Sequence, residues 1–219
     1  MNRWFFRLGA ALAPGLAVAA CSHSALTPTA SAPLPAATSQ VATGRRPYVV
    51  ADVTFLSGMI GHHAQAVEMA GWAPSHGASS SVRILAERIV VSQRDEIAFM
   101  QNWLRDHHEP VPAATSTGMT MTMNGAEHQM LMPGMLSAAQ MKQLDQSRGV
   151  EFDRLFLTFM IQHHQGALVM VETLFGSYGA AQDDLIFKYA SDVSADQSTE
   201  VERMQGMLDG LPPTGRPTP

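Results

Sequence analysis

The sequence predicts an all-α protein, a four-helix bundle built from two repeated helical hairpins that are joined by a long Met-rich connection. Three observations support this prediction. Apolar residues recur at intervals of three and four over most of residues 49–211, and this is the period of an α-helix. The two halves of this region share one sequence pattern. Each predicted hairpin has a single apolar face, which it can bury only against the other hairpin.

Residues 1–20 have the pattern of a secretory signal. Arg3 and Arg7 precede an apolar run that ends at Ala20, and the next residue, Cys21, is the only cysteine of the chain. The pattern resembles bacterial lipoprotein signals, which implies acyl chains on Cys21 and a protein anchored to the membrane of the cell envelope, outside the cytoplasm. The alternative is an ordinary secretory signal with an incidental cysteine. With a single cysteine, no disulfide within the chain is expected.

Residues 21–48 are predicted to form a disordered tether. They are rich in Ala, Pro, Ser and Thr and nearly free of large apolar side chains, so they cannot bury enough surface to offset the entropy of ordering. The whole chain has 14 basic and 19 acidic residues and a formal net charge of -5. A net acidic chain without a basic cluster argues against nucleic acid as a partner.

The first hairpin spans the repeat at residues 52–104, where Pro74 and Gly77 mark the turn between two helical runs. The second hairpin spans the repeat at residues 153–208 and follows the same plan. Two consecutive prolines then forbid continuation of the last helix, and residues 212–219 are predicted to be a disordered tail.

The first helix of each hairpin carries the same motif, Phe-Leu-x-x-Met-Ile-x-His-His-x-x-Ala, which begins at Phe55 and again at Phe156. On a helix with about 100° per residue, the methionine and the two histidines of a copy share one face. If the two faces meet in the core, four imidazoles and two thioethers converge on one metal site. The predicted metal ligands are Met59, His62, His63, Met160, His163 and His164.

Imidazole nitrogen and thioether sulfur, without a thiolate, favour copper(I) or silver(I). Zinc bound through histidine alone is the alternative metal. A different interpretation is that the histidines form a polar network that holds the hairpins in register with no ion bound. If imidazoles bind the metal, its affinity is expected to fall as the pH drops through about 6.5, the ordinary pKa of histidine.

Two acidic residues, Asp52 and Asp153, occupy equivalent positions in the two repeats, on the same helix faces as the histidines. Carboxylates often orient metal-binding imidazoles by accepting a hydrogen bond from the second ring nitrogen. We therefore expect Asp52 and Asp153 to support the histidines in this way.

The connection, residues 105–150, is irregular in pattern and rich in methionine. Its early methionines alternate with small residues, so an extended backbone would place their sulfurs on one side. This resembles the copper-capturing Met-rich segments of extracytoplasmic copper proteins; the alternative is a flexible loop that covers an apolar groove. Ser137 and Gln140 predict a capping box at the start of a short helix that ends near Gly149. The additional candidate metal ligands are Met119, Met121, Met123, His128, Met130 and Met132.

Several kinds of enzyme lack their motifs in this sequence. No glutamate is followed by histidine three residues later, as in di-iron bundles, and the His-Glu-x-x-His motif of zinc proteases is missing. Neither a Gly-rich phosphate loop nor a serine in a nucleophile elbow is present. We therefore expect a binding protein rather than an enzyme.

The chain from about Val50 to Leu211 resembles the bacterial family catalogued as domain of unknown function 305. The resemblance rests on the two Met-Ile-x-His-His-x-x-Ala segments, on the run Met-Pro-Gly-Met-Leu-Ser that begins at Met132, and on Gly-x-Glu-Phe-Asp from Gly149. It implies a ferritin-like four-helix bundle, typically exported, with members associated with copper or silver binding and tolerance. It implies the same metal role for the repeated Met and His residues. Gly61 stands where many relatives have proline.

Together these observations predict an extracytoplasmic lipoprotein that sequesters or relays copper(I) or silver(I), with a protein partner for metal transfer. One alternative is a non-metal interaction or structural module of the cell envelope, whose histidines are structural and whose connection binds a partner. A second alternative is a copper- or iron-dependent oxidoreductase.

Overall fold

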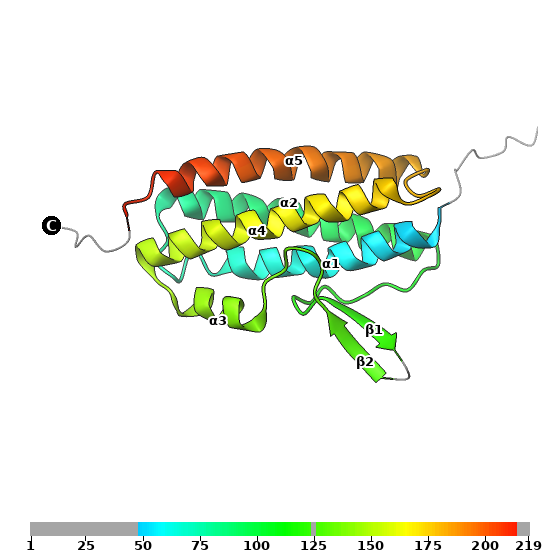
Figure 1. Cartoon of the computed structure of the whole chain (residues 1–219), viewed down its shortest axis with the longest axis horizontal. Coiled ribbons are helices and arrows are strands. Elements are labelled where there is room, and N and C mark those ends of the chain that lie inside the picture. The colour runs from blue at the N-terminus through cyan, green and yellow to red at the C-terminus, as the bar shows by residue number, and fades with distance from the viewer. Residues whose placement is uncertain (1–47, 124–125, 214–219) are drawn as a thin grey trace, which may run out of the picture. The chain divides into compact units, whose positions relative to one another are not determined.

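The computed structural model describes residues 48–123 and 126–213 (Figure 1). The signal, Cys21, all but the last residue of the tether, and residues 214–219 of the tail lie outside the described residues. Over the described ranges the chain forms five helices and one two-stranded sheet: α1 Val50–Gly71, α2 Ser80–Asp106, β1 Met119–Met123, β2 Ala126–Met130, α3 Ala138–Gln146, α4 Gly149–Gly176 and α5 Asp184–Asp209. The predicted all-α class is confirmed, and the four long helices are the ones that the periodicity predicts.

The long helices form two antiparallel hairpins, α1 with α2 and α4 with α5, and the hairpins meet through α1 and α4 (Figure 1). Helices α2 and α5 approach each other much less closely than these three pairs do. The helices begin where the sequence supplies acceptors for unpaired amides. Ser79 caps α2, Asp183 caps α5, and Ser137 with Gln140 forms the predicted capping box of α3.

Asp52 and Asp153 fasten each hairpin to the turn of the other one. Asp52 Oδ1 accepts a hydrogen bond from the Ala181 amide at 2.7 Å, and Asp153 accepts from the Ser79 amide at 3.1 and 3.2 Å. Both carboxylates are buried. The structure thus corrects the expectation that they orient the imidazoles. Asp52 lies on the face of His63, but eleven residues away, which is roughly 16 Å along the helix axis.

The connection contains order that the sequence pattern did not predict, because strands β1 and β2 form an antiparallel hairpin. Its register pairs Met119 with Met130 and Met121 with His128. After the hairpin, residues 131–137, here called the strap, run along α1 and α4 (Figure 1). The predicted irregular segment is therefore a hairpin followed by a docked strap.

Two glutamines and a glycine hold the strap in place. Gln65 Oε1 accepts from the Leu136 amide at 2.7 Å, and its Nε2 donates to the Leu136 carbonyl at 3.1 Å. On α4, Gln162 donates to the Gly134 carbonyl at 3.1 Å. Gly166 lets the strap approach closely, since a Cβ there would lie 2.0 Å from the Pro133 carbonyl oxygen. The strap therefore covers the seam between α1 and α4.

Candidate metal centre

Four histidines meet in the middle of the bundle, and none of them has measurable exposure to solvent. His62 and His63 come from α1, and His163 and His164 come from α4. The rings of His62 and His163 lie 3.8 Å apart between centroids, across the contact between the two hairpins. Within each dyad the centroids are 6.2 and 6.3 Å apart. The repeated dyads thus form one buried layer, here called the histidine layer.

Hydrogen bonds determine which ring nitrogen carries the proton in three of the four imidazoles. His63 Nε2 lies 2.6 Å from Glu96 Oε2 on α2, and His164 Nε2 lies 2.7 Å from Glu200 Oε2 on α5. The equivalent nitrogen of His62 lies 3.0 Å from the carbonyl oxygen of Pro133 in the strap. Carboxylates and carbonyls accept hydrogen bonds, so each Nε2 is the protonated nitrogen. In a neutral imidazole held in this way, the lone pair is on Nδ1.

These Nδ1 atoms have no partner. His62, His63 and His164 each have a buried Nδ1 without a hydrogen bond, and both ring nitrogens of His163 are in the same state. A buried polar atom without a partner is costly, and several of them in one layer require an explanation. An oriented, bare imidazole nitrogen is also what a metal ion binds, and a carboxylate behind the ring is a common support for such a ligand.

The environment keeps two of these histidines neutral. Burial is the main cause that lowers the pKa of His62 to about 3, and the neighbouring His63 lowers it further. Burial likewise holds the pKa of His163 well below its ordinary value, with the other three histidines as additional causes. Both rings are therefore uncharged at neutral pH, and a metal ion does not need to displace a proton from either.

Buried methionines flank the histidine layer on both sides. The apolar core consists of two clusters, and the repeat divides six methionines equally between them. Met59 lies in one cluster and its counterpart Met160 in the other, and both are fully buried. The three methionines of the first cluster are Met59, Met100 and Met170, and those of the second are Met160, Met204 and Met69. Thioether sulfur is thus available on either side of the layer.

The donor set is one of nitrogen and sulfur. Across residues 48–123 and 126–213, no three His, Cys, Asp or Glu side chains form a group that could hold a metal ion. His63 and His164 are instead held toward their glutamates. Imidazole nitrogen together with thioether sulfur is the ligand pair that soft metals prefer.

Most of the additional candidate ligands of the connection lie on the β1–β2 hairpin. Met119, Met121 and Met123 lie on strand β1, and His128 and Met130 lie on β2. Met130 is partly exposed, whereas Met132 at the start of the strap packs against the first apolar cluster.

Several residues at the layer escaped the sequence prediction. Glu96 and Glu200 hold two imidazoles, and the only signal for them was their matched position in the second helix of each repeat. Tyr189 has no such signal, because Leu85 occupies the equivalent position. Its hydroxyl lies 3.5 Å from His63 Nε2 and donates to Met100 Sδ at 3.3 Å. Burial and the charge of Glu96 raise the pKa of Tyr189 well above its ordinary value.

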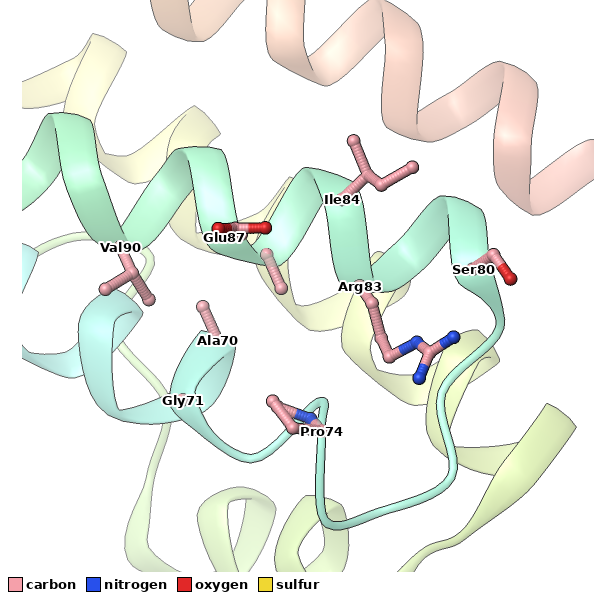
Figure 2. Close-up of a pocket in the computed structure, with 9 residues that line it drawn as sticks. Ala70, Gly71, Pro74, Ser80, Arg83, Ile84, Glu87 and Val90 are labelled. Carbon is pink, nitrogen blue, oxygen red and sulfur yellow. The ribbon is translucent and has the colours of Figure 1, made fainter.

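A pocket of about 620 Å³ lies elsewhere, where the end of α1 faces the first turns of α2 (Figure 2). It is lined by Ala70, Gly71 and Pro74 on one side and by α2 residues that include Arg83 and Glu87 on the other. No residue of the histidine layer lines it. In the described part of the chain, no helix combines the length and the apolar character needed to cross a bilayer.

The fold and the layer define a class of protein, an all-α bundle of two repeated hairpins with buried imidazoles and thioethers at their contact. The family model described as Domain of unknown function (DUF305) matches residues 52–208, and the chain belongs to this family. No curated protein sequence matches the chain significantly.

Solved structures resemble the whole bundle. A DUF305 protein of Streptomyces coelicolor, described as secreted, is 28% identical with a TM-score of 0.61, and the alignment covers 73% of this chain and 92% of that one. A DUF305 fragment from Deinococcus radiodurans is 28% identical with a TM-score of 0.62 and coverages of 75% and 99%. CopM in its Cu(I)-bound form is 26% identical with a TM-score of 0.54 and coverages of 72% and 95%. CopM has also been solved with Cu(II) and with Ag bound.

Proposed function

We propose that this protein is an extracytoplasmic metal-binding protein that sequesters or relays copper(I) or silver(I) through its buried histidines and methionines. One observation carries the proposal. Three imidazoles are held with Nε2 protonated by acceptors, and their buried Nδ1 atoms have no hydrogen-bond partner. The proposed ligands are Met59, His62, His63, Met160, His163 and His164, with Glu96 and Glu200 orienting two of the rings.

The choice of metal follows from the donors and from the relatives. Neutral nitrogen and thioether sulfur suit monovalent, soft ions better than zinc, which usually takes thiolate, imidazole or carboxylate in a closed tetrahedron. CopM, which shares the fold at 26% identity, binds copper and silver in its solved structures. These observations favour copper(I) or silver(I) as the ion.

The proposed location is the cell envelope. The relative from Streptomyces coelicolor, which is described as a secreted protein, supports a place outside the cytoplasm. A lipid anchor at Cys21 remains the interpretation of the lipoprotein-like signal. We propose binding and transfer rather than catalysis, with a second protein as donor or acceptor of the ion.

A competition titration tests the proposed site. A chromogenic copper(I) chelator is titrated with the wild type and with a variant in which His62, His63, His163 and His164 are all changed to Ala. We expect the variant to lose at least 100-fold in affinity, because it lacks every imidazole of the layer. The control is His108→Ala, which removes an exposed histidine outside the layer and should bind like the wild type.

A stability measurement separates metal binding from a purely structural role. If the histidines serve only to hold the hairpins in register, copper(I) will leave the melting temperature of the wild type unchanged, and the His108→Ala variant will behave in the same way. If they bind the ion, saturating copper(I) will raise the melting temperature of both proteins. Wild-type affinity in the variant that lacks all four histidines would disprove the proposed site.

A further inference from the structure

A second pocket, of about 230 Å³, lies between α2 and α5 and is here called the α2–α5 pocket. Its lining follows the internal repeat: Ser92, Gln93 and Glu96 of α2 match Asp196, Gln197 and Glu200 of α5. A water molecule occupies about 30 Å³ of liquid, so the pocket has room for an ion with several waters. It forms where the bundle is most loosely packed, since α2 and α5 have the least contact of the neighbouring long helices.

Two glutamates contact both the pocket and the histidine layer. Glu96 and Glu200 line the pocket, and each uses Oε2 to hold a buried imidazole, His63 or His164. Their side chains are 25% and 18% exposed, while the imidazoles have no exposure. Each glutamate is thus in contact with solvent on one side and with a proposed metal ligand on the other.

Two glutamines also line the pocket, and their side-chain oxygens have no hydrogen-bond partner. Gln93 and Gln197 line the same pocket, yet they are only 2% and 4% exposed. The Oε1 atom of each is buried without a hydrogen bond. An amide oxygen can only accept, so a donor or a cation is needed to satisfy it. The same unpartnered atom therefore occurs at the same position of both repeats.

The strap occupies the opposite side of the bundle. The strap covers the seam between α1 and α4, and His62 itself bonds to the Pro133 carbonyl of the strap. Gly61 and Gly166 bring the connection into close contact with the helices, since an added Cβ at either position would lie 3.1 and 2.0 Å from a backbone oxygen. A pocket of about 450 Å³ also lies on this side, between α1, α4 and the strap, and it reaches the layer through Pro133, which is bonded to His62. The α2–α5 pocket differs from it because two of its lining residues are carboxylates that hold imidazoles.

The charge of the α2–α5 pocket suits a cation. Three carboxylates, Glu96, Asp196 and Glu200, line it together with one cation, Arg88. Carboxylate and amide oxygens bind a hydrated ion loosely and exchange quickly, whereas the nitrogens and sulfurs inside bind a soft ion more strongly. Such a gradient of ligand type favours inward movement of a copper(I) or silver(I) ion.

We propose that the α2–α5 pocket is the port through which a metal cation enters the histidine layer, with Gln93, Glu96, Gln197 and Glu200 as oxygen ligands in transit. This inference rests on the proposed function, because it assumes that the layer binds the ion. It assigns the two hairpin seams different tasks: the strap lies across the α1–α4 seam, and the α2–α5 seam admits the metal.

Loading kinetics test the port. Copper(I) is supplied as a chromogenic chelate, and its transfer to the full-length protein is followed by stopped-flow absorbance. The variant Gln93→Leu/Gln197→Leu replaces the orphaned oxygens by apolar groups, which should preserve the fold because no hydrogen bond is lost. We expect loading to slow at least tenfold, with equilibrium affinity within threefold of the wild type.

Two further variants make the result decisive. Ser92→Trp places a large side chain at the exposed rim without touching the layer, and it should also slow loading. The matched control, Glu87→Gln, removes a carboxylate from the pocket of Figure 2 and should load at the wild-type rate.

Wild-type loading rates in both port variants would overturn the port. A loss of equilibrium affinity in the glutamine variant would also overturn it, because the glutamines would then be ligands of the final site. Failure of the proposed function gives a different result, namely copper(I) affinity that survives removal of all four histidines.

Discussion

At the scale of single residues, the two repeats supply the same candidate metal ligands, but the hydrogen-bond partners of those ligands differ. His63 and His164 both rest on a glutamate, at 2.6 and 2.7 Å. Only His63 has a second polar neighbour, the Tyr189 hydroxyl at 3.5 Å from Nε2. At the position equivalent to Tyr189, the first repeat has Leu85. The halves of the histidine layer are therefore chemically unequal.

This inequality predicts unequal effects of removing the glutamates. Glu200→Ala leaves the buried Nε2–H of His164 without an acceptor and frees its tautomer, so copper(I) affinity should fall about 10- to 100-fold. Glu96→Ala should have a smaller effect, because the Tyr189 hydroxyl can accept the hydrogen bond from His63 instead. Competition titration of the two variants measures the difference.

The control for this prediction is the double variant Glu96→Ala/Tyr189→Phe, in which His63 has no replacement acceptor. Its loss of affinity should match that of Glu200→Ala. Equal losses for the two single glutamate variants would mean that Tyr189 gives His63 no support.

At the scale of elements, hydrophobic periodicity and turn residues predicted the four long helices, and they predicted α3 from its capping box. These features are local, so a sequence contains them directly. The β1–β2 hairpin and the strap were not predicted, because they depend on contacts with distant helices. Gln65 illustrates this, since its partners Leu136 and Ser116 are separated from it by 71 and 51 residues.

The candidate site was predicted in part for the same reason. The repeated Met and His residues are visible because the same motif occurs twice on one helix face. The glutamates behind the rings belong to other helices, and only the assembled bundle pairs Glu96 with His63, 33 residues away. Asp52 and Asp153 looked equally suitable because angular position on a helix ignores distance along its axis. Their real partners are backbone amides at the ends of the bundle.

The strap supplies a prediction at this scale. In Gly166→Ala, the new Cβ would lie 2.0 Å from the Pro133 carbonyl oxygen, so the strap must move away from α4 and His62 must lose its acceptor. We expect the free energy of unfolding to fall by about 1–3 kcal/mol, as for other overpacked sites. Urea denaturation measures this loss, and hydrogen exchange should show faster exchange at the Leu136 amide, which Gln65 now protects.

Gly176→Ala is the matched control, because it lies on the same helix and its Cβ would meet nothing within 4 Å. It should leave stability unchanged or raise it slightly, since alanine is the better helix former. Undiminished stability in Gly166→Ala, with a protected Leu136 amide, would show that the strap is not held against α4.

At the scale of the whole molecule, a polar layer divides the apolar core into two clusters. The layer holds four buried imidazoles with several unpaired nitrogens, and this arrangement opposes the stability of the metal-free bundle. Metal binding would satisfy those nitrogens and join the clusters. The metal-free protein should consequently have a lower free energy of unfolding than the metal-bound protein. This free energy should also depend on pH.

The pH dependence follows from the lowered pKa of His62, about 3, compared with about 6.5 for an unfolded histidine. Above pH 6.5 the imidazole is neutral in both states and does not favour unfolding. Between about 6.5 and 3 the unfolded chain binds a proton that the folded chain excludes, so stability falls as the pH is lowered. Each such histidine contributes a slope of roughly 1.4 kcal/mol per pH unit, and His163 shifts in the same direction.

Urea unfolding of the metal-free protein between pH 7.5 and 4.5 measures this slope. In the conservative variant His62→Gln, the slope of the free energy of unfolding against pH should be smaller by about the contribution of one histidine. The exposed control His108→Ala should keep the wild-type slope. An identical slope in His62→Gln would mean that His62 titrates normally in the folded state. The same pKa also changes the expectation that metal affinity falls as the pH drops through about 6.5. Protons should compete for His62 only near pH 3, so copper(I) bound in the layer should persist well below pH 6.5.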